Sequence, residues 1–229
     1  MKAHPDIVAI GASSGGIEAL QSLLEGFSDL DAIVLVVLHR PADRASYLQE
    51  ILARKSSMPV VVARHGELLH RGACYIGDPS QHLMVGPGLR ADLLPDHRYT
   101  TRNIDQLFIS LARHFGPRTI GVVLSGQLDD GTRGLAAIKK AGGIALVQSP
   151  GEAAYPDMPR NAIAYDGPID LVAPTSDLAA EITRPTSTSP AKRGRRIGRL
   201  FQVRETGVPI ENRQPSEAGD SCMGGCPDL

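Results

Sequence analysis

Short apolar runs alternate along this chain with longer segments in which apolar residues recur every three or four positions. The short runs are typical of strands buried on both faces of a sheet, and the longer segments have the period of a helix with one apolar face. Strands are therefore expected over residues 7–10, 32–38, 60–63, 119–124, 144–147 and 169–172, and helices over residues 17–24, 46–54, 103–115 and 134–141. This alternation predicts an α/β fold with a doubly wound, mainly parallel sheet and helices on both of its faces.

Two further apolar runs, residues 74–76 and 83–85, are flanked by Gly and Pro. Runs this short between turn-forming residues are typical of hairpins. We expect them to form a small antiparallel region beside the main sheet.

The character of the sequence changes at about Thr183. Residues 183–190 are rich in Ser, Thr and Pro, residues 192–196 are basic, and little apolar periodicity follows. Such a segment lacks the apolar surface that a packed core needs. We expect one globular domain over residues 1–182 and a flexible, mostly disordered tail over residues 183–229.

Two of the three cysteines, Cys222 and Cys226, lie in this tail with loose metal-ligand spacing. A four-coordinate zinc site needs two more ligands, and the chain has no second cysteine pair. We expect two solvated thiols and no metal site.

The bulk properties exclude several classes of protein. The formal net charge of −1 argues against a general nucleic-acid-binding protein. No apolar stretch approaches the roughly 20 residues that span a bilayer, and the N-terminal residues lack the apolar core of a signal peptide. Three cysteines are too few for a disulfide framework. We expect a soluble cytoplasmic protein that binds no nucleic acid and does not insert into membranes.

The most informative motif is Gly11-Ala12-Ser13-Ser14-Gly15, which joins the first predicted strand to the first predicted helix. It fits the pattern G-x-S-x-G, in which a sharp turn raises a serine hydroxyl above the end of a parallel sheet. A helix N-terminus at this place also favours negative charge. The motif therefore predicts either a nucleophilic Ser13 or a turn that binds a phosphate or another anion.

Three familiar uses of such a turn do not fit this chain. An α/β-hydrolase places earlier strands before its nucleophile, but only a few residues precede Ile7. The glycines at positions 11, 15 and 16 do not match the dinucleotide-binding pattern, and no Walker lysine follows them. The serine is expected at the end of the first strand of another doubly wound sheet.

A histidine and two aspartates follow other predicted strands. His39 follows the strand over 32–38, and Asp129 and Asp130 lie in the loop after the strand over 119–124. Because ligands bind beyond the carboxyl ends of parallel strands, we expect these residues near Ser13. Together they supply a nucleophile, a base and a carboxylate that orients the base. Spacing alone does not choose between Asp129 and Asp130.

Four motifs follow one another in the order found in a known family. They are Ile10-Gly-Ala-Ser-Ser-Gly-Gly16, Leu38-His-Arg-Pro41, Ser125-Gly-Gln-Leu-Asp-Asp-Gly131 and Met158-Pro-Arg-Asn-Ala-Ile163. Together they resemble the catalytic domain of the bacterial chemotaxis protein-glutamate methylesterases, CheB. Smaller similarities occur at residues 72–76, at His82 and at residues 105–108, so the resemblance covers roughly residues 7–174.

The resemblance implies a serine hydrolase that removes methyl groups from glutamate γ-methyl esters on chemoreceptors through an acyl-enzyme, without a metal or an organic cofactor. In the family the same chemistry also deamidates glutamines. Ser13 would be the nucleophile, His39 the general base and Asp130, rather than Asp129, the third member of the triad. The remaining implied site residues are Ser14 and Gln127 as oxyanion donors and Arg160 as a substrate contact, although Arg160 and His82 also fit loop hydrogen-bonding roles.

The implied partners are the cytoplasmic helices of methyl-accepting chemoreceptors, with a methyltransferase or a separate response regulator as further candidates. The resemblance does not include the receiver domain that normally precedes this catalytic domain in the family. Any phosphorylated regulator is therefore expected on another polypeptide.

Several residues depart from the family's motifs. The family usually has Gln-His-Met-Pro where this chain has Leu38-His-Arg-Pro41, and its acid loop usually reads Thr-Gly-Met-Gly-x-Asp-Gly. Ser125, Gln127 and Leu128 therefore differ, and a side chain in place of glycine at Leu128 could alter the loop. These changes bear on substrate preference, and those at Leu38, Arg40 and Leu128 favour one alternative, a catalytically weak scaffold that binds receptors or a methyltransferase partner. A second alternative is an anion- or nucleotide-binding module that uses the turn at Gly15 and Gly16.

Overall fold

The computed structural model describes residues 6–28, 30–43, 45–95, 102–165 and 167–184. A seven-stranded sheet with the strand order β3-β4-β2-β1-β7-β8-β9 forms its centre, and all of its recorded pairings are parallel. The strands are β1 (Ile7–Ala12), β2 (Ile33–Leu38), β3 (Val60–Val62), β4 (Ala73–Ile76), β7 (Thr119–Val123), β8 (Ile144–Gln148) and β9 (Leu171–Ala173). The expected parallel α/β sheet is confirmed.

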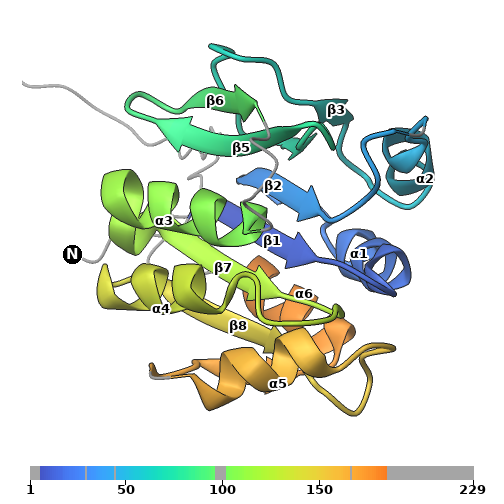
Figure 1. Ribbon diagram of the computed structural model, residues 1–229, viewed down its shortest axis with the longest axis vertical. Helices are drawn as coiled ribbons and strands as arrows, with labels where there is room; N and C mark the ends of the chain where they lie inside the picture. Colours follow the sequence, from blue (N-terminus) through green and yellow to red (C-terminus); the bar gives the residue numbers. More distant parts are fainter. Residues whose placement is uncertain (1–5, 29, 44, 96–101, 166, 185–229) are drawn as a thin grey trace, which may run out of the picture. The chain divides into compact units, whose positions relative to one another are not determined.

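Helices cover both faces of this sheet, as the alternating pattern predicts. On one face, apolar side chains of β1 and β2 pack against α1 (Gly16–Glu25), α2 (Leu48–Ala53) and α6 (Thr175–Thr183). The other face is covered by α3 (Asn103–Phe115), α4 (Thr132–Lys140) and α5 (Asp157–Ala164), and Figure 1 shows α3 and α4 in front of the strands. The short 3-10 helix Gly116–Arg118 links α3 to β7.

A small antiparallel hairpin is present, but its composition differs from the expectation. Residues 74–76 belong to β4, which lies between β3 and β2 in the main parallel sheet. Both faces of β4 are covered, since Cys74 and Ile76 pack in one hydrophobic cluster and Tyr75 in the other. The hairpin instead joins β5 (Gln81–Gly86) to β6 (Arg90–Pro95), a strand that was not predicted.

The C-terminal part of the domain contains two helices that the apolar pattern did not predict, α5 and α6. Helix α6 ends at Thr183, and residues 185–229 lie outside the described residues, so the expected tail and its Cys222 and Cys226 remain predictions. In the part of the chain that is described, none of the helices has the length and apolar composition needed to cross a bilayer.

The strand order reverses at β1, and this determines where a site can form. The chain passes from β1 to β2 on one side and returns to β7 on the other. Ala12 pairs in register with Leu38, and Gly11 with Val123, so Ser13, His39 and the loop after β7 leave the sheet at the same edge. In doubly wound sheets, ligands bind at such a switch point.

Candidate active site

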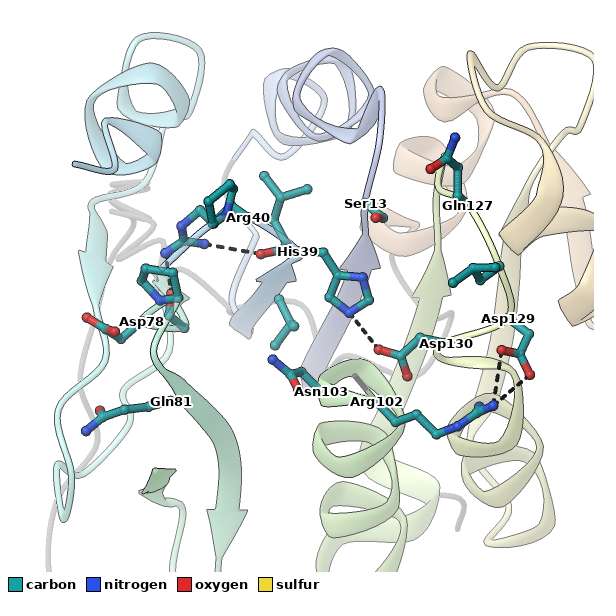
Figure 2. A pocket seen from close by; sticks show the side chains of 16 residues that line it. Ser13, His39, Arg40, Asp78, Gln81, Arg102, Asn103, Gln127, Asp129 and Asp130 are labelled. Atoms are coloured by element: carbon teal, nitrogen blue, oxygen red, sulfur yellow. Dashed lines mark hydrogen bonds and ion pairs between the residues drawn. The ribbon is translucent and has the colours of Figure 1, made fainter. Parts of the chain in front are cut away.

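A cavity of about 530 Å³ opens at the carboxyl ends of β1, β2 and β7. We call it the strand-end cavity. Figure 2 shows Ser13, His39 and Asp130 in it together, although 91 residues separate His39 from Asp130 in the sequence. The polar side chains around it include those of Ser13, His39, Arg40, Arg102, Gln127 and Asp130.

Ser13 lies in a tight turn between β1 and α1, held close to the loop that follows β7. Its amide N–H donates to the carbonyl of Ser125 at 2.9 Å. Gly15 has a φ of +67°, which favours glycine, and a Cβ at Gly126 would lie only 2.8 Å from the Cβ of Ser13. The glycines of both motifs therefore allow the close approach that places Ser13 in the cavity.

His39 follows β2 directly, and its ring lies between Ser13 and Asp130 (Figure 2). The Nε2 atom of His39 lies 2.8 Å from Oδ2 of Asp130. A carboxylate only accepts hydrogen bonds, so Nε2 carries the proton and Nδ1 has the free lone pair. His39 is therefore oriented as a base whose open nitrogen is Nδ1.

The Asp130 carboxylate is buried and is held by backbone N–H groups as well as by His39. Its oxygens accept from Ile104 N–H at 2.9 Å, Asp105 N–H at 3.0 Å and Gly131 N–H at 2.8 Å. Two of these donors belong to the first turn of α3, where the helix dipole favours negative charge. The same carboxylate thus caps α3 and orients the imidazole.

Asp129, the alternative carboxylate, faces a different partner. Its two oxygens lie 3.0 and 3.1 Å from the guanidinium of Arg102. Hydrogen bonding to Asp129 raises the pKa of Arg102, with a smaller contribution in the same direction from Asp105. The geometry therefore places Asp130, and not Asp129, against His39.

The CheB methylesterase family model matches residues 8–182 of this chain. The chain belongs to the CheB methylesterase family. It is 34% identical over 184 residues to a protein-glutamate methylesterase/protein-glutamine glutaminase of Moorella thermoacetica, and 37% identical over 185 residues to a protein with this name, numbered 3, of Geobacter sulfurreducens. These matches cover 77% of this chain but 43% and 49% of the relatives, so the chain spans about half the length of these curated relatives.

A solved structure has the same fold as this CheB-family chain. The crystal structure of the Thermotoga maritima CheB methylesterase catalytic domain superposes with a TM-score of 0.71 and 26% sequence identity. The match covers 79% of this chain and 98% of the T. maritima chain. The similarity therefore extends over essentially the whole of that catalytic domain.

The other residues expected at the site of this CheB-family chain lie in different surroundings. Gln127 lines the strand-end cavity, whereas Ser14 precedes α1 and Arg160 is exposed on α5, outside the cavity lining. The backbone N–H groups of Ser14 and Gln127 donate to no acceptor among the described residues. Such unused donors at a helix N-terminus and in a facing loop suit an oxyanion. His82 is buried in β5.

Leu128 occupies the loop position where the family usually has glycine, and the loop keeps a conformation that favours glycine. Leu128 has a φ of +65°, and its side chain is 73% exposed at the edge of the strand-end cavity. Its carbonyl accepts a hydrogen bond from Asn161 Nδ2 at 2.7 Å, which holds the loop against α5. A leucine in this left-handed conformation carries backbone strain.

Sequence reasoning assigned no role to Asp105, which proves to support the site. Its buried carboxylate accepts from Gly134 N–H at 2.7 Å and from Arg102 at 3.2 Å. Burial raises the pKa of Asp105, and the Asp130 charge raises it further, while the Gly134 and Arg102 hydrogen bonds lower it. The sequence did contain a signal for this role, because Asp105 lies in the first turn of the helix predicted over residues 103–115. Acidic side chains are favoured near helix N-termini.

Among the described residues, no group of three or more His, Cys, Asp or Glu side chains is arranged to hold a metal ion. Cys74 is a buried free thiol, and burial raises its pKa to about 12. A thiol with this pKa is neutral and unreactive near neutral pH. The strand-end cavity presents a hydroxyl, an imidazole, carboxylates and two guanidinium groups.

Proposed function

We propose that this chain is a protein-glutamate methylesterase that acts in the cytoplasm on the cytoplasmic helices of methyl-accepting chemoreceptors. The names of its relatives and the family model support this activity. The observation that carries the proposal is the 2.8 Å contact of His39 Nε2 with Asp130 Oδ2 in the cavity that Ser13 lines. A methyltransferase or a separate response regulator is a further candidate partner.

In the proposed reaction, Nδ1 of His39 accepts the hydroxyl proton as Ser13 Oγ attacks the γ-carbonyl carbon of the glutamyl methyl ester. The new oxyanion receives hydrogen bonds from the backbone N–H groups of Ser14 and Gln127. The tetrahedral intermediate then collapses, and the methoxy oxygen takes the proton from Nδ1 and leaves as methanol. An ester between Ser13 and the glutamyl group remains.

Hydrolysis of this acyl-enzyme uses the same groups. His39 removes a proton from water, which attacks the acyl carbon, and the proton passes to Ser13 Oγ as the glutamate leaves. Throughout, Asp130 keeps the proton on Nε2 and stabilises the imidazolium. Deamidation of glutamine follows the same path, but its leaving nitrogen depends more strongly on protonation by His39.

The test is methanol release from a methylated receptor by Ser13→Ala. We expect a loss of at least about 100-fold, because the nucleophile is removed. Ser176→Ala, which changes an exposed serine on α6, is the matched control and should retain wild-type activity. A fluorophosphonate probe should label Ser13 in the wild-type chain.

Other outcomes would favour the alternative functions. A wild-type chain that binds receptors but neither releases methanol nor reacts with the probe would be a scaffold of the same fold. A nucleotide that raised the melting temperature without labelling of Ser13 would indicate an anion-binding module.

A further inference from the structure

Arg40 places a guanidinium in the wall of the strand-end cavity, one residue after His39. One terminal nitrogen donates to the carbonyl of Gly77 at 2.5 Å, and the other lies 3.4 Å from the carbonyl of Leu38. The buried Nε atom has no hydrogen-bond partner among the described residues. In Figure 2 this side chain lies on the side of His39 away from Asp129 and Asp130.

Arg40 differs from the other arginine of the cavity in its ionic contacts. Arg102 is paired with both Asp129 and Asp105. Arg40 forms no ion pair with any described residue, and its hydrogen bonds go to uncharged carbonyls. Asp78, the acidic neighbour on the same wall, uses its carboxylate to accept hydrogen bonds from Ser80. The charge of Arg40 is therefore available to a ligand.

Because the Arg40 guanidinium is partly buried, its charged form is less well solvated than that of a surface arginine. Desolvation lowers the pKa of Arg40, and the nearby Asp78 charge only partly opposes this effect. An arginine nevertheless stays protonated in proteins, so a charged and partly desolvated guanidinium lines the cavity. Such a group gains most from an anion that makes charge-assisted hydrogen bonds with it.

We propose that Arg40 forms a carboxylate-binding subsite of the active site, so that this enzyme prefers glutamyl esters with a second acidic side chain one helical turn away. The subsite rests on the proposed function, since it takes a neighbouring part of the same substrate. On a helix, residues three or four positions apart lie about 5–6 Å from each other on one face. Ser13 and Arg40 line the same cavity, so in the proposed complex a helical substrate presents its ester to Ser13 and its carboxylate to Arg40.

The test compares two helical peptides that each carry one glutamyl methyl ester. One has Glu four residues from the ester, and the other has Gln at that position. For the wild-type chain we expect kcat/KM for methanol release to be about 10-fold higher with the Glu peptide, and the ratio to fall with added salt. Arg40→Met should bring the ratio to about one through a larger loss on the Glu peptide than on the Gln peptide, and Arg40→Lys should keep part of the preference.

Arg113→Met is the matched control, because Arg113 is exposed in the last turn of α3, at the opposite end of that helix from the cavity. It should leave the peptide ratio unchanged. If Arg40→Met fails to fold, the wild-type ratio, its salt dependence and Arg40→Lys still test the subsite.

Three results would overturn the subsite. Equal wild-type rates on the two peptides would exclude it while leaving the proposed function intact. An equal loss of kcat/KM on both peptides in Arg40→Met would show that Arg40 only stabilises the loop at Gly77 through its hydrogen bond. No hydrolysis of either peptide by the wild-type chain would contradict the proposed function and the subsite together.

Discussion

Asp130 caps α3, the helix that carries Asp105, and Asp105 in turn binds the N-terminus of α4, the helix that follows Asp130. Asp130, which directly precedes Gly131 and α4, accepts the N–H groups of Ile104 and Asp105 at the start of α3. Asp105, in the first turn of α3, accepts the N–H of Gly134 at the start of α4. This exchange ties two helix N-termini together beneath the strand-end cavity. The position of the Asp130 carboxylate against His39 therefore depends on the packing of α3 against α4.

Replacing Asp130 should have a much larger effect on catalysis than replacing Asp129. In Asp130→Asn, the amide no longer fixes the proton on Nε2 of His39, and we expect methanol release to fall by about 10³-fold or more. Asp129→Asn removes only an ion pair with the half-exposed Arg102 and should lower kcat by less than about 10-fold. Steady-state kinetics of both variants check this order, and similar losses in the two would contradict the assignment of Asp130.

The buried charge of Asp105 should make stability depend on pH. Its pKa is raised in the folded protein from the ordinary value of 3.8, so the folded state holds this proton more tightly than the unfolded state does. The contribution of Asp105 is therefore greatest below pH 3.8 and is lost as the pH rises through its raised pKa. Asp105→Asn has no proton to lose, so the wild-type chain should lose stability relative to this variant as the pH rises above 3.8 and through the raised pKa of Asp105.

Urea unfolding at a series of pH values measures this difference. Asp177→Asn, at an exposed position in α6, is the matched control for the loss of one carboxylate. A difference between the wild-type chain and Asp105→Asn that grew in favour of the wild type with rising pH would show that Asp105 is stabilised as an anion.

Leu128→Gly should relieve backbone strain in the acid loop. A leucine at φ +65° costs roughly 1–2 kcal/mol, and the greater freedom of glycine in the unfolded chain offsets part of the gain. We expect the free energy of unfolding to rise by up to about 1 kcal/mol. Leu128→Ala keeps the strained backbone and should give no such gain. Thermal unfolding of the two variants distinguishes relief of strain from loss of the exposed side chain.

Much of the sheet was predictable because strand and helix periods are local properties. Residues 103–115 were expected as a helix and form α3 with the same bounds. The apolar run over 32–38 became β2, with all six residues from Ile33 to Leu38 buried. Residues 74–76 were assigned to the wrong sheet, because a run of three apolar residues does not identify its partner strand. Helix α5 was missed because it is short and contains Pro159.

The sequence by itself determined the positions of Ser13 and His39 at strand ends, since a strand followed by a glycine-rich turn or a polar residue is recognisable from local pattern. The spacing of residues left Asp129 and Asp130 open, and the family resemblance implied Asp130. The tertiary structure supplied the physical distinction, because backbone N–H groups at the N-terminus of α3 donate to Asp130 while Asp129 pairs with Arg102. It also decided that the Arg40 guanidinium lines the cavity without an ionic partner among the described residues. Both outcomes depend on contacts between segments far apart in the chain, which local periodicity does not encode.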